Sequence, residues 1–229
     1  MSDVAPPNER GTYDPLIQGL AANLAPVRRV APPLLRTIFW LAAVAIATLF
    51  LAAFADLAAT EHRVTAAPDM WLAVAGSALT ALLATMAAFQ LSVPDGKTIW
   101  ALVPIPSALL WVGASGLGCL RTWLIPGTHD ASLAEAKDCF VFIVGLSIPL
   151  SAMLILMLRR GYSLWPNLMG VMGGLAVAAA SATLLNFFHP FDAAATDLSV
   201  HAVAVTVVVF ANQLVAYRFT KRETLRLRT

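Results

Sequence analysis

Six long apolar runs, separated by short polar segments, constrain this chain more than any other feature. They cover residues 34–55, 70–91, 99–118, 139–158, 167–188 and 198–217. A run of about twenty residues, coiled as an α-helix that rises about 1.5 Å per residue, matches a hydrocarbon core of about 30 Å. Charged residues make up 12% of the chain, against about a quarter in soluble domains. We therefore expect an all-α integral membrane bundle of six transmembrane helices in a lipid bilayer. A barrel would instead show alternating segments of about ten residues.

The apolar runs divide the chain into three segments. We expect residues 1–33 to form a cytosolic N-terminal segment with a short amphipathic helix, residues 34–217 to form the six-span transmembrane domain, and residues 218–229 to form a basic cytosolic tail. Within the first segment, the polar composition of residues 1–13 predicts disorder.

The short helix of the N-terminal segment is predicted from its start signal and its spacing. Asp14 is a suitable N-cap and Pro15 suits the first helical position. Apolar residues then recur at helical spacing, namely Leu16, Ile17, Leu20 and Leu24. Pro26 ends this pattern. A helix this short is marginal alone in water, so its apolar face must pack on the membrane or the bundle, or fill the groove of a partner protein.

Basic residues predict the orientation of the chain in the membrane. In a six-span topology, twelve of the 15 lysine and arginine residues fall on the side of the N-terminus, and only Arg63, Arg121 and Lys137 fall on the other side. The positive-inside rule therefore puts both termini in the cytosol. Arg36 is one of the twelve, at the entry to the first span. Tryptophans near the span ends are expected to anchor at the interface: Trp40, Trp100, Trp123 and Trp165.

Within the spans, glycine and proline predict local features. Gly170 and Gly174, four residues apart, permit close approach of a neighbouring helix. Pro104 and Pro106 are expected to kink or delay the third helix. The centres of the spans lack Asp, Glu, Lys and Arg, which disfavours an ion-coupled transporter.

The two cysteines are the candidate chemical site. Cys119 and Cys139 lie at the predicted outer ends of the third and fourth spans, where an oxidising compartment would meet them. One interpretation is a structural disulfide between the two helices; the other is a sensor of oxidants or of thiophilic metals. Arg121 and Lys137, each two residues away, favour the thiolates that reactivity requires. His129 adds a third ligand, but the spacing matches no standard zinc pattern, so we expect no bound metal and no cofactor.

Four stretches of this sequence together resemble the NrsF family (negative regulator of sigma F) of bacterial inner-membrane anti-sigma factors. They are LIQGLAANLAPVRRVAPPLLR at 16–36, FQLSVPDG at 89–96, the loop with the two cysteines, and FFHPFD at 187–192. The resemblance implies six spans and sequestration of an extracytoplasmic-function sigma factor at the inner membrane. It further implies release on oxidative or heavy-metal stress through Cys119 and Cys139. The segment it marks supplies candidate contacts for the sigma factor: Leu16, Ile17, Leu20, Leu24, Arg28 and Arg29.

The resemblance implies a regulator that is not an enzyme and that does not itself bind nucleic acid. Two other classes of membrane protein are alternatives. A membrane thiol oxidoreductase that passes electrons to a quinone generally uses two cysteine pairs including a C-x-x-C, whereas this chain has one widely spaced pair. A small-solute permease is disfavoured by the uncharged centres of the spans.

Overall fold

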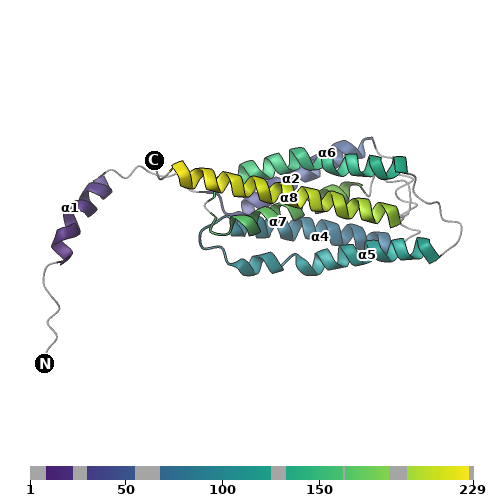
Figure 1. Ribbon diagram of the computed structural model, residues 1–229, viewed down its shortest axis with the longest axis horizontal. Coiled ribbons are helices and arrows are strands. Elements are labelled where there is room, and N and C mark those ends of the chain that lie inside the picture. The colour runs from purple at the N-terminus through teal and green to yellow at the C-terminus, as the bar shows by residue number, and fades with distance from the viewer. Residues whose placement is uncertain are drawn as a thin grey trace, which may run out of the picture. The chain divides into compact units, whose positions relative to one another are not determined.

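The structure, a computed structural model, describes residues 9–22, 30–54, 68–124, 133–161, 163–185 and 195–226, and every regular element in these ranges is a helix (Figure 1). The elements are α1 (Glu9–Ala22), α2 (Pro33–Ala52), α4 (Pro68–Leu91), the 3₁₀ helix η1 (Thr98–Leu102), α5 (Ile105–Leu124), α6 (Leu133–Leu158), α7 (Pro166–Leu185) and α8 (Ala195–Arg226). The chain divides into two compact units, Met1–Val30 and Ala31–Thr229. The expected all-α class is confirmed for the described residues.

The first unit contains α1, which begins earlier than the sequence predicts. The helix starts at Glu9 and not at Asp14, and Pro15 lies inside it. Pro15 has no N–H to donate to the carbonyl of Gly11, so the helix loses one backbone hydrogen bond and continues. An Asp-Pro pair suits the start of a helix, but here it follows the first turn, and part of the stretch expected to be disordered is helical.

The second unit contains the apolar helices. Five of its helical segments are long and apolar enough to cross a membrane: Pro33–Ala52, Trp71–Leu91, Thr98–Leu117, Phe140–Leu158 and Pro166–Leu185. They correspond to the first five predicted spans. The sixth predicted span falls in α8, whose apolar segment Ala202–Arg218 is shorter, so six spans and the orientation of the termini stay predictions.

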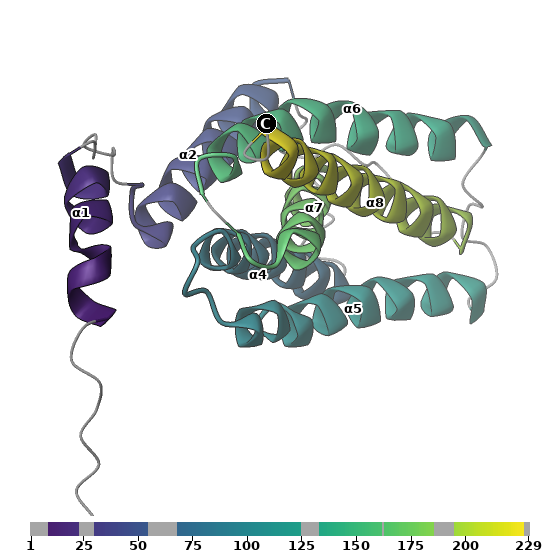
Figure 2. The same cartoon turned by 60° about the vertical axis from the view of Figure 1, so that its left-hand side comes forward.

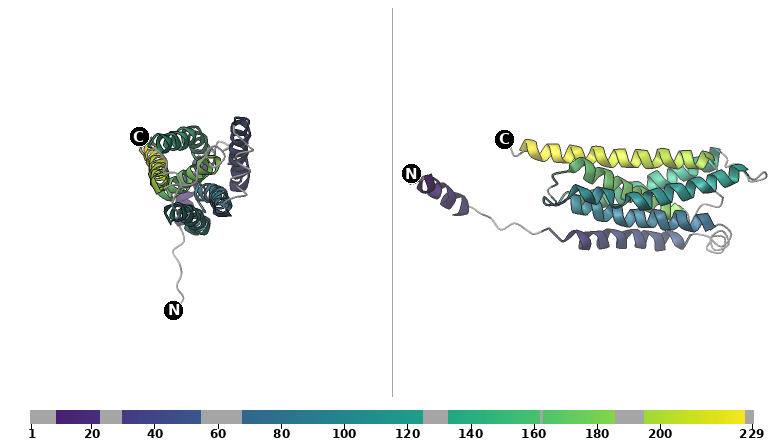
Figure 3. Two further views of the ribbon diagram at one scale, coloured as in Figure 1. Left: turned by 90° about the vertical axis from the view of Figure 1, so that its right-hand side faces the viewer. Right: turned by 90° about the horizontal axis from the view of Figure 1, so that it is seen from below.

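Helix α7 is the centre of the second unit. It packs most extensively against α8 and α4 and also against α6, and nearly all of its residues from Met169 to Leu185 are buried (Figure 3). Helix α2 packs on α4 and α6, while α5 packs on α4 and α8. The middle of the bundle is therefore built around a helix of small residues, which lets its neighbours come close.

The predicted close approach at Gly170 and Gly174 is confirmed, and α8 is the neighbour. A Cβ atom added to Gly170 would lie 2.8 Å from the Cα atom of Gln213, and one added to Gly174 would lie 2.6 Å from the Cα atom of Val209. Both clashes are with backbone, which cannot swing aside as a side chain can. Glycine at these two positions thus sets the distance between α7 and α8.

Polar side chains join the helices inside this apolar bundle. Each pair of hydroxyl or amide groups bonds across two helices, as buried polar groups must where water is excluded. The pairs are Thr80–Ser107 at 3.1 Å, Thr183–Ser77 at 2.8 Å, Ser147–Ser181 at 3.1 Å and Asn212–Ser151 at 2.9 Å. They link α4 with α5 and α7, and α6 with α7 and α8.

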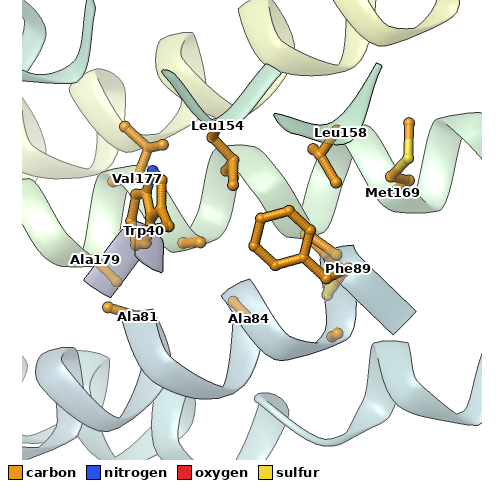
Figure 4. Packing of buried hydrophobic residues seen from close by; sticks show 14 of the residues in the cluster. Trp40, Ala81, Ala84, Phe89, Leu154, Leu158, Met169, Val177 and Ala179 are labelled. Carbon is orange, nitrogen blue, oxygen red and sulfur yellow. The ribbon is translucent and has the colours of Figure 1, made fainter. Parts of the chain in front are cut away.

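The largest side chains of the core fill the space between alanine-rich faces of α4 and α7. Figure 4 shows Trp40 from α2 beside Ala81, Val177 and Ala179, with Phe89 facing Leu158. Trp40 is fully buried, so the prediction that it anchors at the interface is wrong. Its neighbours are small enough to leave room for an indole, and a membrane interface is therefore not its only suitable place.

The helix bounds differ from the apolar runs mainly at the polar ends. The proline pair delays the third helix as predicted, because η1 and a turn precede α5. Helix α5 continues to Leu124, α6 begins at Leu133, and α8 continues to Arg226 through most of the basic tail. Hydropathy locates the part of a helix that suits a membrane, and these helices continue beyond it.

Candidate functional site

A buried arginine marks the end of the bundle at which α2 begins. Pro32 is the N-cap of α2 and Pro33 is its first residue, and proline suits this position because its fixed φ matches the helix. Arg36 follows in the first turn, and its amide donates to the Pro32 carbonyl at 3.2 Å. Arg36, Thr37 and Trp40 share one face and are the buried residues of α2. The start of the helix is thus directed into the bundle.

Arg36 is 5% exposed, and its guanidinium has three kinds of partner. Its Nη1 donates to the hydroxyl of Ser92 at 2.8 Å, and its Nη2 donates to the backbone carbonyl of Met157. Its Cζ lies 4.5 Å from the centroid of the Phe89 ring. A hydroxyl, a carbonyl and an aromatic face therefore surround this cation in the part of the chain that the structure describes.

Two helix ends explain why a cation is stable there. Helices α4 and α6 both end at this site, and the last carbonyls of an α-helix lack partners within the helix and carry partial negative charge. Met157 is among the last four residues of α6, so the Arg36 side chain caps the C-terminal end of α6. Ser92 relays the same role at α4, because its hydroxyl donates to the Phe89 carbonyl at 2.7 Å. The Phe89 ring adds a cation–π contact away from water.

The segment between α6 and α7 closes over this cluster. The Ser163 hydroxyl donates to the Leu91 carbonyl at 2.6 Å and accepts the Trp165 amide at 3.0 Å. A Cβ atom on Gly161 would lie 2.3 Å from the Ser92 carbonyl oxygen, so only glycine permits this approach. Two of the stretches quoted above, ending at Arg36 and starting at Phe89, meet here.

Trp40 makes a second attachment of α2 to α6. Its indole Nε1 donates to the Leu150 carbonyl at 3.3 Å, directly after Pro149 within α6. Beyond Trp40, the outer side of α2 is open, and Ile46, Leu49 and Phe50 are each about two-thirds exposed or more. Helix α2 is therefore attached along one face, and the described hydrogen bonds of its side chains to other helices lie in its first two turns.

The cysteines lie at the opposite end of the bundle. Cys119 is in the last two turns of α5 and Cys139 is in the second turn of α6, and both of these helix ends point away from the Arg36 end (Figure 1). Their backbones are described, but their side chains fall outside the described part of the chain. His129 and the stretch 187–192 lie wholly outside the described residues. Lys137 is described and is exposed.

Helix α1 presents an apolar stripe. Leu16, Ile17 and Leu20 are 58 to 63% exposed, and Tyr13, at 57%, extends the same face by one turn. We call these four residues the α1 stripe. Leu24, Arg28 and Arg29, the other candidate contacts, lie outside the described residues.

Two features were missed from the sequence. Tyr13 precedes the helix start that the sequence predicts, so the sequence does not assign it to the apolar face of the helix. The sequence counts Arg36 only among the basic residues that predict the orientation of the chain. The signal that could reveal its burial is its place in the stretch 16–36, three residues after Pro33 and four residues before Trp40.

A comparison with protein families was made for the whole chain. The family model NrsF, described as negative regulator of sigma F, matches residues 20–221. Searches for similar curated proteins and for similar solved structures found no match.

Proposed function

The chain belongs to the NrsF family of negative regulators of sigma F, and on this premise we propose that it is an inner-membrane anti-sigma factor controlled by its cysteines. The family is regulatory and its partner is a sigma factor. In our proposal this partner is of the extracytoplasmic-function type, the cytosolic N-terminal segment holds it, and reaction of Cys119 and Cys139 in the periplasm releases it.

The observation that carries the proposal is the α1 stripe. Its residues stand at i, i+3, i+4 and i+7, the spacing by which an amphipathic helix fills an apolar groove of a partner. More than half of each side chain is exposed, and a helix of 14 residues is marginal without a surface to cover it. A sigma factor with an apolar groove supplies that surface.

Exposed basic residues support a cytosolic Arg36 end. Lys97, Arg159, Arg160 and Arg218 are exposed at the helix ends on this side of the bundle. The positive-inside rule favours the cytosol for such a side. Because the N-terminal segment enters the bundle at the same end, it would meet the transcription machinery.

The arrangement of α5 and α6 supports a role for the cysteines. The main packing partners of α5 are α4 and α8, and those of α6 are α7, α8 and α2; Figure 2 shows α8 between α5 and α6. A disulfide requires two Cα atoms within about 7 Å, so a bond between Cys119 and Cys139 would draw together the ends of two helices that lie on either side of α8. The oxidant takes up two electrons as both thiols lose their protons. Soft metal ions could bridge the same two thiolates.

The test is retention of the sigma factor by the full chain in detergent. Co-expressed extracytoplasmic-function sigma factor should copurify with the wild type, and Leu16→Asp together with Leu20→Asp should abolish this. Gln18→Asp is the matched control, because Gln18 is an exposed residue on the opposite side of α1. Undiminished retention by the doubly substituted stripe would refute α1 as the binding surface.

The sensing part of the proposal has its own test. A thiol oxidant should release the sigma factor from the wild type, whereas the protein with Cys119→Ser and Cys139→Ser should keep it. Release from the serine variant would show that the cysteines are not the sensor, and it would leave the anti-sigma role intact.

A further inference from the structure

We propose that Arg36 is the positioning residue through which α6, the helix that carries Cys139, sets the position of the N-terminal segment. This inference rests on the proposed function. It assigns the transmission of the signal to the contact between Arg36 and the Met157 carbonyl.

Helix α6 is the direct connection between the two ends of the bundle. It contains Cys139 near its start and Met157 near its end. Both described polar contacts between α6 and α2 use α6 backbone carbonyls, those of Leu150 and Met157. These two positions are seven residues apart and lie on one face of α6. A displacement of α6 therefore acts on α2 through its backbone, at two defined points.

The two contacts lie at different distances from the point at which α6 is held. Ser147 bonds Ser181 of α7 at 3.1 Å, and Ser151 accepts from Asn212 of α8 at 2.9 Å. These bonds pin the middle of α6, around Pro149, to two neighbours. A helix pinned at its middle turns about that point, so a displacement of one end produces an opposite displacement of the other.

The lengths of the two arms assign the roles. At about 1.5 Å per residue, Cys139 lies about 15 Å from Pro149 along the helix axis and Met157 lies about 12 Å from it on the other side. The Met157 carbonyl would therefore move about four-fifths as far as the Cys139 end. The Leu150 carbonyl, next to the pivot, would hardly move. The Arg36 contact transmits the turn of α6, and the Trp40 contact, next to the pivot, transmits hardly any of it.

The position of Arg36 in the chain connects this movement to the partner. Arg36 is six residues after Val30, the last residue of the N-terminal unit. The described hydrogen bonds between α2 and α6 come from the first two turns of α2, so these turns are the part that responds. Withdrawal of the Met157 carbonyl removes a partner of a buried cation, and the start of α2 must then move to find another.

The experiment compares four forms of the full-length protein in lipid nanodiscs, each loaded with the copurified sigma factor. They are wild type, Arg36→Met, Trp40→Phe and Ser92→Ala. Methionine keeps an unbranched, flexible side chain but cannot donate to Met157. Ser92→Ala is the matched control, because it removes a partner of Arg36 on α4 and leaves the contact with α6. Each form is treated with thiol oxidant, and disulfide formation and released sigma factor are measured in the same sample.

We expect all four forms to bind the sigma factor before oxidation and to form the disulfide equally. Arg36→Met should release at most a fifth of what the wild type releases, while Trp40→Phe and Ser92→Ala should release as the wild type does. Equal release by Arg36→Met would overturn the inference. This is the result expected if α6 bends at Pro149 and its C-terminal half stays in place. Should Arg36→Met not elute as a monodisperse protein, Arg36→Leu takes its place, because leucine cannot donate to Met157 either; at least a twofold loss of release supports the inference, and no loss overturns it.

A second readout needs no sigma factor. Amide hydrogen exchange over residues 30–40 should change on oxidation of the wild type and stay constant in Arg36→Met. No change in the wild type would overturn the inference. Failure of the wild type to bind or release the sigma factor, with the exchange change present, would refute the proposed function and not the transmission through Arg36.

Discussion

The guanidinium carbon of Arg36 lies 4.5 Å from the centre of the Phe89 ring, and this places the first residues of α2 against the last turn of α4. Both side chains are almost completely buried. Away from water, such a cation–π contact is worth up to about 2 kcal/mol. It joins two stretches of sequence that are more than fifty residues apart.

We therefore expect Phe89→Leu to lower the free energy of unfolding by about 2 kcal/mol, the sum of a lost cation–π contact and a partly emptied ring volume. Equilibrium unfolding in mixed micelles, followed by far-ultraviolet circular dichroism, measures this change. Phe39→Leu is the control, because Phe39 is an exposed residue of α2, and it should change the value by less than about 0.5 kcal/mol. Equal effects of the two substitutions would contradict the role of the ring.

Two neighbouring glycines of α7 should respond to alanine with opposite signs. A Cβ atom on Gly174 would lie 2.6 Å from the Val209 Cα atom, so α7 and α8 must separate, at a cost of about 1–3 kcal/mol. A Cβ atom on Gly173 would lie 3.4 and 3.5 Å from methyl groups of Leu154 and Leu158, which is ordinary contact. Gly173→Ala should then gain up to about 1 kcal/mol from helix propensity. Thermal unfolding of both variants in one detergent measures these changes in stability. A loss of stability at both positions would argue against the backbone contact as the reason for the difference.

The hydrogen bond between Thr183 and Ser77 should contribute measurably to stability. Thr183→Val keeps the shape of the side chain and removes the 2.8 Å bond between α7 and α4, so we expect a loss of about 0.5–1.5 kcal/mol. Thr206→Val is the control, because the exposed Thr206 hydroxyl donates to the Ala202 carbonyl of its own helix at 2.7 Å and bonds no other helix among the described residues. The same unfolding assay applies. A larger loss at Thr206 than at Thr183 would count against the inter-helix bond.

Tyr13 should contribute to sigma-factor binding, on the proposed function. It lies on the α1 stripe and is 57% exposed, and tyrosine is often a dominant residue in protein interfaces. Tyr13→Ser should weaken binding about tenfold, equivalent to about 1.4 kcal/mol, as measured by titration of the solubilised protein with labelled sigma factor. Gln18→Ser should leave the affinity unchanged. An unchanged affinity for Tyr13→Ser would restrict the interface to residues from Leu16 onward.

The spans were predictable because an apolar run of about twenty residues has few other stable forms. The ends were not, since Leu120 to Leu124 and Leu133 to Asp138 are helical without being strongly apolar. Hydropathy also assigned Trp40 to an interface, because its ring suits both an interface and a cavity lined by alanines. Which applies is decided by Ala81 and Ala179, far away in the sequence.

The site was predictable only in part for a similar reason. Spacing alone brought Leu16, Ile17 and Leu20 onto one face, because a helix fixes that relation locally. The burial of Arg36 depends on the meeting of two helix ends, those of α4 and α6, and no local pattern encodes that meeting. The position of Gly161 against Ser92 is equally non-local.

The small buried face of α2 makes the N-terminal part of the chain exchangeable. The buried residues of α2 are Arg36, Thr37 and Trp40, so few side chains must match when residues 1–52 are exchanged as one cassette of sequence. A relative that keeps these three residues could donate its own cassette to this bundle. Such a chimera would bind the partner of one protein and respond to the stimulus of another. Families built in this way can change which partner responds to which stimulus without changes in the rest of the bundle.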